Sequence, residues 1–131
     1  MKKDYKKWMA QKTPINNDKV RPFFHEREIW FSSLGENVGF EQDGDKETYL
    51  RPVLIVRKFN NEIFWGVPLT KSNKQKDNRY YYSFCFIKGI ISLAVLSQIR
   101  LIDSKRLARQ IGTMKGDDFK RVKEKLKALL P

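Results

Sequence analysis

The sequence predicts a small, mainly antiparallel β-barrel or sheet that carries one packed helix at its C-terminal end. Short apolar runs rich in β-branched and aromatic residues recur between turn signals, which is typical of strands. A single helical repeat of apolar residues follows the last of these runs. The chain has 131 residues, of which 40% are apolar and 13% aromatic, and this composition suits one domain with a modest core.

The residues before the first predicted strand are basic and helical in pattern. Apolar residues at helical spacing among lysines predict a short amphipathic helix over residues 3–13, which would end near Pro14. Such a helix would either touch nucleic acid as a basic arm or pack its apolar side on the domain. Residues 14–22 have the composition of a linker. We therefore expect an N-terminal extension over residues 1–26 and a barrel domain over residues 27–131.

A first strand and a long polar loop follow. Residues 28–34 are rich in apolar and aromatic side chains and predict a strand that ends at Gly35. Residues 35–50 contain three glycines and five acidic residues against one lysine. Loops of this length in a compact domain are usually functional or disordered.

The stretch from Arg51 to Thr70 predicts a β-hairpin. Two apolar runs, residues 52–56 and 63–69, are separated by a turn signal at residues 58–61. Arg51 comes just before the first strand and Thr70 just after the second. Because the strands of a hairpin run antiparallel, those two positions should be neighbours at one edge of the sheet. The hairpin would thus bring a guanidinium and a hydroxyl together.

A basic segment continues from the hairpin. Residues 71–79 carry four cations against one acid and are expected to form a loop at the same edge as Arg51 and Thr70. The cations of this loop are better placed to hold a phosphate backbone than those at the chain ends; a merely solvated loop is the alternative. They are Lys71, Lys74, Lys76 and Arg79.

The C-terminal half predicts further strands and the helix. Strands are expected over residues 80–87, 91–96 and 108–114, with turns at residues 88–89 and 103–107. Alternation places four aromatic residues on one face of the first of these strands, where they would form core or a subunit interface, or stack on a base. They are Tyr80, Tyr82, Phe84 and Phe86. The helix is expected over Asp117–Leu130. Its apolar stripe consists of Phe119, Val122, Leu126 and Leu129.

The composition narrows the possible partners and sites. The formal net charge is +12, which favours an anionic partner such as nucleic acid or a membrane surface, but most of the excess lies at the two chain ends. One cysteine and one histidine exclude an internal disulfide framework and make a His/Cys metal site within one chain implausible. A reducing cytoplasm is the expected compartment. No run approaches the roughly 18 apolar residues of a membrane span.

Six short motifs, taken in order, resemble the PemK/MazF family of toxins from bacterial toxin–antitoxin systems. They cover residues 27 to about 130, and residues 1–26 lie outside them. Six motifs in register are far more specific than any one of them. The motifs are Glu28-Ile29-Trp30, Gly39-Phe40-Glu41-Gln42, the run Arg51–Val56, Val67-Pro68-Leu69-Thr70, Ser97-Gln98-Ile99-Arg100 with Asp103, and Lys105-Arg106-Leu107.

The resemblance implies an SH3-like barrel of the CcdB/PemK type that forms a homodimer. It also implies sequence-specific cleavage of single-stranded RNA without a metal or cofactor, and a cognate antitoxin that blocks the site. Such cleavage would leave a 2′,3′-cyclic phosphate and a 5′-hydroxyl. The family's catalytic arginine and threonine correspond to Arg51 and Thr70, and the glutamate that some members use matches Glu41.

Four further features concern positions around this predicted site. Ser72 joins the four loop cations as an RNA-contact candidate and is one guess for the general acid. Gln98 and Arg100 match a family motif and are expected to hold the barrel edge or the dimer interface. Residues 43–50 are an insert relative to the family, which would reshape substrate choice or cover the site. Two acid groups found in some members are missing here: an acid just before the Gln-Ile/Pro-Arg motif is replaced by Ser97, and a histidine just before the Glu-Gln pair is replaced by Phe40.

Two other functions remain open from the sequence. An SH3-like barrel that holds RNA or an acidic peptide without cutting would account for the missing acid groups and the acidic loop. A gyrase poison of the CcdB type would bind a topoisomerase and would not depend on Arg51. The pairing of Arg51 with Thr70 favours the ribonuclease over both.

Overall fold

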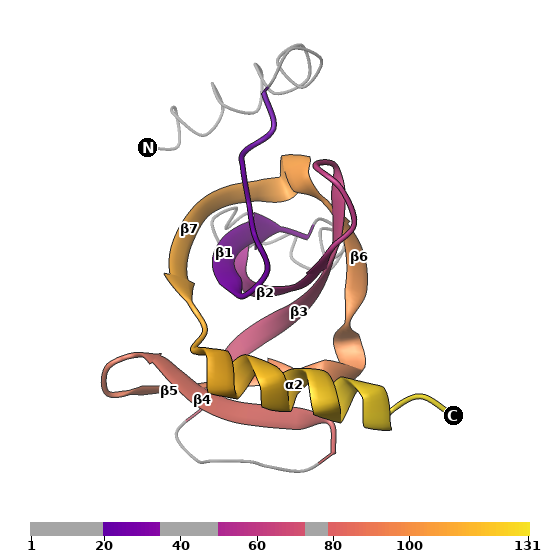
Figure 1. The fold of residues 1–131 in the computed structure, drawn as a ribbon. Helices are drawn as coiled ribbons and strands as arrows, with labels where there is room; N and C mark the ends of the chain where they lie inside the picture. The colour runs from indigo at the N-terminus through magenta and orange to yellow at the C-terminus, as the bar shows by residue number, and fades with distance from the viewer. Residues whose placement is uncertain (1–19, 35–49, 73–78) are drawn as a thin grey trace, which may run out of the picture.

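The chain folds into a half-open β-barrel that rests on a β-hairpin and a helix (Figure 1). The computed structural model describes residues 20–34, 50–72 and 79–131. The mainly β prediction with a C-terminal helix is confirmed, whereas the helix expected over residues 3–13 lies outside the described residues.

Seven strands and one helix make up the described part of the fold. The strands are β1 (Glu28–Ser33), β2 (Leu50–Lys58), β3 (Ile63–Ser72), β4 (Tyr81–Ile87), β5 (Ile90–Val95), β6 (Arg100–Asp103) and β7 (Leu107–Thr113). The helix is α2 (Gly116–Ala128), and two 3-10 turns are η3 (Leu96–Gln98) and η4 (Ser104–Arg106).

Strand β3 organises the sheet, whose order is β4-β5-β3-β2-β1-β7 with β6 paired to β3. Its first part pairs with β2 and β6, and its last part pairs with β5, always antiparallel. The same strand therefore belongs first to the half-barrel and then to the β4–β5 layer beneath it (Figure 1).

Most of the predicted elements are confirmed, but some details are wrong. Arg51 and Thr70 do not flank the two hairpin strands, because they lie within β2 and β3. Gly89, at φ +83°, makes the predicted turn between β4 and β5. The basic segment does not begin as a loop, because Lys71 and Ser72 continue β3 and pair with Ser92 and Ile91. Strand β6 was not predicted, since it is four residues long and buries one side chain, too short for a clear period-2 signal.

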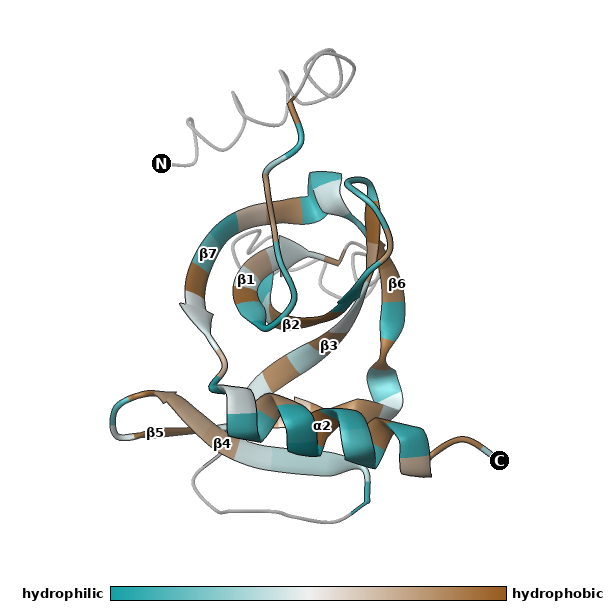
Figure 2. Cartoon of the chain, in the orientation of Figure 1, coloured by the Kyte–Doolittle hydropathy of each residue, from teal (hydrophilic) through white to brown (hydrophobic). Residues whose placement is uncertain are grey.

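Two apolar cores lie on the two faces of the β2–β3 ladder, because successive side chains of a strand point to opposite faces. Both hydrophobic and hydrophilic residues are found along β6 and β7 (Figure 2). The inner core fills the half-barrel and consists of Phe24, Trp30, Leu34, Val53, Ile55, Phe64, Ile102 and Leu107. The outer core lies against β4, β5 and α2 and consists of Ile29, Leu54, Val56, Val67, Leu69, Tyr82, Phe84, Ala94, Leu96, Met114, Phe119 and Val122.

Helix α2 covers the outer core with its predicted apolar stripe. Phe119 and Val122 are buried, and Leu126 and Leu129 pack against the same core. The Tyr82 hydroxyl donates a hydrogen bond of 2.6 Å to the Asp118 carboxylate, which ties the first helical turn to β4. Burial and this carboxylate together raise the pKa of Tyr82 above its usual value. The aromatic face of β4 is thus core at Tyr82 and Phe84.

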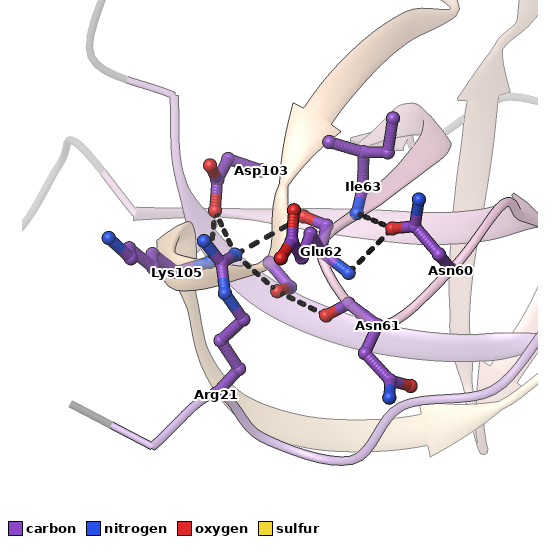
Figure 3. Close-up of polar contacts among 8 residues, drawn as sticks. Arg21, Asn60, Asn61, Glu62, Ile63, Asp103 and Lys105 are labelled. Carbon is purple, nitrogen blue, oxygen red and sulfur yellow. Dashed lines mark hydrogen bonds and ion pairs between the residues drawn. The ribbon is translucent and has the colours of Figure 1, made fainter. Parts of the chain in front are cut away.

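The segment before β1 is anchored on the barrel. Phe24 is fully buried in the inner core, where its ring centroid lies 5.1 Å from that of Phe64. The Arg21 guanidinium donates to the Asp103 carboxylate at 2.6 Å and to the Ser104 hydroxyl at 3.0 Å (Figure 3). The packed unit therefore includes residues before position 27, and the proposed division of the chain at that position stays a prediction.

Candidate active site

Arg51 and Thr70 lie at the same end of the β2–β3 hairpin, as the sequence predicts. The last Cα pair of this ladder joins Val53 to Pro68, so each of the two residues lies two positions beyond it. Because side chains alternate, Arg51 shares the face of Val53 and Thr70 shares the face of Pro68, which is the inner face of the half-barrel. Both residues are exposed to solvent.

The strands part at this end of the hairpin. Strand β3 leaves β2 after Pro68 and pairs with β5 from Leu69 onward, with Thr70 opposite Leu93. Arg51 instead pairs with Ser32 of β1. The two candidate residues therefore stand on diverging strands that are each held by a separate neighbour. Pairing with a neighbouring strand fixes the backbone from which each side chain starts.

Ser32 is a polar residue of this site that the sequence did not single out. It is 0% exposed, and its hydroxyl has no hydrogen-bond partner within the described ranges. It lies directly opposite Arg51 across the β1–β2 ladder, with Leu107 of β7 on its other side. A buried hydroxyl without a partner costs about 1–3 kcal/mol, so this polar group stands out beside Arg51.

The predicted RNA-contact residues are only partly described by the structure. Lys71 is exposed on β3, one residue beyond Thr70, and Ser72 is the last residue of that strand. Arg79 is exposed, and its guanidinium carbon lies 5.8 Å from the ring centroid of Tyr80. The remaining candidates fall outside the described residues, so their placement stays untested. They are Glu41, Lys74 and Lys76.

Gln98 and Arg100 flank the start of β6. Gln98 is exposed at the end of η3, and Arg100 is half-buried opposite Gly66 of β3. Alternation places Arg100 on the same face of β6 as the inner-core residue Ile102. These positions are compatible with the structural role expected for them, which stays a prediction.

Titratable groups outside the hairpin do not gather into a metal site in the described residues. Over those ranges, no three His, Cys, Asp or Glu side chains lie close enough together to hold a metal ion. The Cys85 thiol is free and exposed on β4, and the His25 ring lies 3.1 Å from the Glu28 carboxylate. No helix in the described ranges has the length and apolar character needed to cross a bilayer.

The chemistry of the hairpin end suits an anionic, phosphate-bearing ligand. A guanidinium offers two parallel donors that match the oxygens of a phosphate, a geometry that lysine lacks. A threonine hydroxyl adds one donor and two acceptor lone pairs. Together these groups can bind a phosphodiester and stabilise additional negative charge that develops on it.

A family model matches most of the chain. Residues 26–130 match the model of the PemK-like, MazF-like toxin of type II toxin–antitoxin systems. This match spans most of the chain, and the chain therefore belongs to the PemK/MazF-like toxin family. No curated protein matches the sequence significantly.

Solved toxin structures share the fold at low sequence identity. MazF from Deinococcus radiodurans superposes with a TM-score of 0.59 at 19% identity, covering 85% of this chain and 97% of that one. The Mycobacterium tuberculosis toxin MazF-mt6 gives a TM-score of 0.58 at 17% identity, with coverages of 78% and 94%. A MazE–MazF structure from D. radiodurans gives 0.55 at 16% identity, with coverages of 82% and 96%. The SH3-like, MazF-type fold predicted from the sequence is thereby confirmed.

Proposed function

We propose that this toxin is a metal-independent endoribonuclease that cleaves single-stranded RNA at specific sequences. The observation that carries the proposal is the position of Arg51 and Thr70, which stand at one end of the β2–β3 hairpin, exposed and on the same face. Membership of the PemK/MazF-like family supports it, because the residue types and their order match the family's catalytic pair.

Arg51 would carry the largest share of catalysis. In RNA cleavage the ribose 2′-oxygen attacks the adjacent phosphorus, the bond to the 5′-oxygen breaks, and a 2′,3′-cyclic phosphate and a 5′-hydroxyl result. The phosphorane that forms on the way carries extra negative charge on its oxygens. The guanidinium of Arg51 would donate two hydrogen bonds to those oxygens, and stabilisation of developing charge is usually the largest catalytic contribution.

Thr70 and Glu41 would handle hydrogen bonding and proton transfer at the attacking oxygen. The Thr70 hydroxyl would orient the 2′-hydroxyl or donate to the phosphate. Glu41 would accept the 2′-proton, an effect of roughly 10²–10⁴-fold for a general base. The proton that the 5′-oxygen needs would come from Ser72 or from Arg51 itself.

Specificity and partners would come from the surfaces around this pair. Lys71, Lys74, Lys76 and Arg79 would hold the backbone of single-stranded RNA, whose bases are read by stacking and edge contacts. By analogy with the MazE–MazF structure of D. radiodurans, this chain would bind a cognate antitoxin. It would also form the homodimer that the family implies. The reaction would take place in the cytoplasm, where messenger RNA is found.

The first test is cleavage of a long, mixed-sequence RNA in the presence of EDTA, with the cut ends mapped. The wild type should give discrete cuts, and Arg51→Ala should give none. Arg51→Lys keeps the charge but loses the paired donors, so it should retain little activity. Arg109→Ala is the matched control, because Arg109 is also an exposed strand arginine, but it stacks on Phe31 of the β1–β7 ladder.

Each result decides between the candidate functions. Cuts that vanish in Arg51→Ala and persist in Arg109→Ala would establish the ribonuclease. A folded wild type that binds RNA without cutting would point to a binding module. A wild type that leaves RNA intact and instead traps a topoisomerase on DNA would point to the gyrase poison.

A further inference from the structure

An exposed aromatic patch lies near the turn of the β2–β3 hairpin, away from Arg51 and Thr70. The patch consists of Arg57, Phe59, Trp65 and Leu101. Arg57 of β2 pairs with Trp65 of β3, and Trp65 pairs with Leu101 of β6, so the three side chains form a row across neighbouring strands. Phe59 and Trp65 are each 42% exposed, and Leu101 is 54% exposed.

The local backbone turns these side chains outward. A register shift between Ile55 and Arg57 interrupts the alternation of β2, and a β-bulge of this kind re-aims the side chain that follows it. Trp65 shares its strand face with Val67 and Leu69, which are buried in the outer core. The cover that β4, β5 and α2 give to that core therefore ends before Trp65.

The rings of the patch are held in a defined arrangement. The Phe59 and Trp65 centroids lie 5.0 Å apart with planes at 81°, an edge-to-face contact. The guanidinium carbon of Arg57 lies 5.6 Å from the Phe59 centroid, within the range of a cation–π contact. Large aromatic rings that stay exposed while being positioned by neighbours are typical of binding surfaces.

The charge around the patch favours an anionic partner. Arg57 is the one charged side chain of the patch, because Lys58 lies on the other face of the hairpin, where its Nζ donates to the Phe24 backbone oxygen at 2.9 Å. The nearby Asp103 is already paired with Arg21 at 2.6 Å (Figure 3). Single-stranded nucleic acid suits both the rings and the cation of the patch, because its bases stack on aromatic rings and its phosphates bind cations.

We propose that the aromatic patch is a second contact surface for single-stranded RNA, separate from the Arg51–Thr70 site. Bases would stack on Phe59 and Trp65, and Arg57 would neutralise a neighbouring phosphate. The choice of RNA as the partner rests on the proposed function, whereas the surface itself does not.

Position and orientation separate the two sites. Trp65 and Thr70 are five residues apart on β3, or roughly 17 Å along a strand. They also lie on opposite faces, since Thr70 follows the inner-face alternation of Pro68 and Trp65 lies on the outer face. A long RNA that reached both sites would bind more tightly than a short one, because the second contact becomes intramolecular.

The test measures RNA binding by fluorescence anisotropy in the cleavage-silent Arg51→Ala background. The probes are an RNA of about thirty nucleotides, which can span several contacts, and an abasic RNA of the same length, which cannot stack. Trp65→Ala should weaken binding of the normal RNA by roughly 5- to 100-fold and leave binding of the abasic RNA unchanged. Trp65→Leu, which keeps an apolar side chain without a ring face, should behave like Trp65→Ala, whereas Trp65→Phe should retain most of the affinity.

Leu130→Ala is the control for a general loss of exposed apolar surface, since Leu130 is 71% exposed beyond the end of α2. This variant should bind both RNAs with the same affinity as the Arg51→Ala protein in which it is made. Thermal melts and size-exclusion chromatography on every variant show that the fold and the oligomeric state are kept.

Two outcomes would overturn the proposal. Equal binding of long RNA by Trp65→Ala and its parent would remove RNA as the occupant of the patch. A change in oligomeric state in Trp65→Ala but not in Trp65→Leu would identify the patch as a protein interface instead. A wild-type Arg51 protein that shows patch-dependent binding without cleavage would refute the ribonuclease and leave this proposal standing.

Discussion

At the scale of single residues, the proposed chemistry depends on the guanidinium of Arg51 and the hydroxyl of Thr70. Arg51 supplies paired donors that lysine cannot copy, and Thr70 supplies a hydroxyl from strand β3. Ser32 adds a buried hydroxyl directly opposite Arg51, with no partner in the described part of the chain. Only Arg51 and Thr70 could be found from the sequence, since they flank apolar runs. Ser32 sits inside such a run, and its burial is decided by β2 and β7 on either side of it.

Thr70→Val should lower the rate of RNA cleavage by roughly 10²-fold or more, which is the typical effect of removing one donor to a developing oxyanion. Valine has nearly the same shape, so the barrel should melt at almost the same temperature. Thr70→Ser keeps the hydroxyl and should retain most of the rate. Single-turnover cleavage of a mapped substrate measures both variants, and equal rates for Thr70→Val and wild type would remove Thr70 from the mechanism.

At the scale of elements, strand β3 connects the two halves of the sheet and depends on Gly66. A Cβ at this position would lie 2.6 Å from Val53 Cγ1 and 2.8 Å from Ile102 Cδ1, both in the inner core. Only glycine therefore lets β2 and β6 close on β3 at this point.

Gly66→Ala should lower the free energy of unfolding by about 1–3 kcal/mol, the usual effect of overpacking a core. Gly116→Ala is the matched control, because a Cβ there meets no atom within 4 Å and alanine favours the helix. Urea denaturation measures both variants. A Gly66→Ala protein as stable as the wild type would mean that Val53 and Ile102 can move to accommodate the added methyl group, and would contradict the requirement for glycine.

Asp103, at the junction of β6 and η4, should make the stability of the fold depend on pH. Burial pushes the pKa of Asp103 upward, but the Lys105 backbone N–H and the Arg21 guanidinium outweigh it, so this pKa lies below its usual value of 3.8. A carboxyl whose pKa is depressed by folding stabilises the fold above its unfolded pKa and loses that effect as the pH falls through the folded pKa.

Asp103→Asn should therefore be less stable than the wild type by about 0.2–1 kcal/mol near neutral pH, as for other part-exposed ion pairs. The difference should shrink as the pH falls below the usual carboxyl value, because the wild-type side chain then also becomes neutral. Denaturation midpoints across the pH range measure it. A difference that persists unchanged in acid would assign the effect to geometry and not to charge.

At the scale of the whole molecule, the segment before β1 acts as a strap across the half-barrel. Phe24 fills the inner core, Lys58 Nζ donates to its backbone oxygen at 2.9 Å, and Arg21 reaches across to Asp103. These contacts join residues 34 to 82 positions apart in sequence. The barrel is therefore closed partly by residues that the sequence assigned to an extension.

Phe24→Ala should lower the free energy of unfolding by about 3–5 kcal/mol, as expected when a buried phenylalanine is truncated. Phe23→Ala, which truncates a neighbouring phenylalanine that is 82% exposed, should change stability by far less. Thermal and urea unfolding of the two proteins measure the contrast. Equal losses in both variants would contradict the role given to the burial of Phe24.

The sequence by itself determined the features that depend on neighbours along the chain. The β2–β3 hairpin, the turn at Gly89 and the apolar stripe of α2 follow from side-chain period and turn residues, and the hairpin alone places Arg51 and Thr70 at one end of the sheet. Only the tertiary structure decided the continuation of β3 to Ser72 and the short strand β6, because each needs a partner strand to supply its hydrogen bonds.

The same reason explains the remaining features. The buried hydroxyl of Ser32, the exposed face of Trp65 beside Leu101, and the contact of Arg21 with Asp103 all join strands that are distant in sequence. Burial and exposure at such positions depend on which strands meet when the barrel closes, and this information is absent from the local pattern of residues.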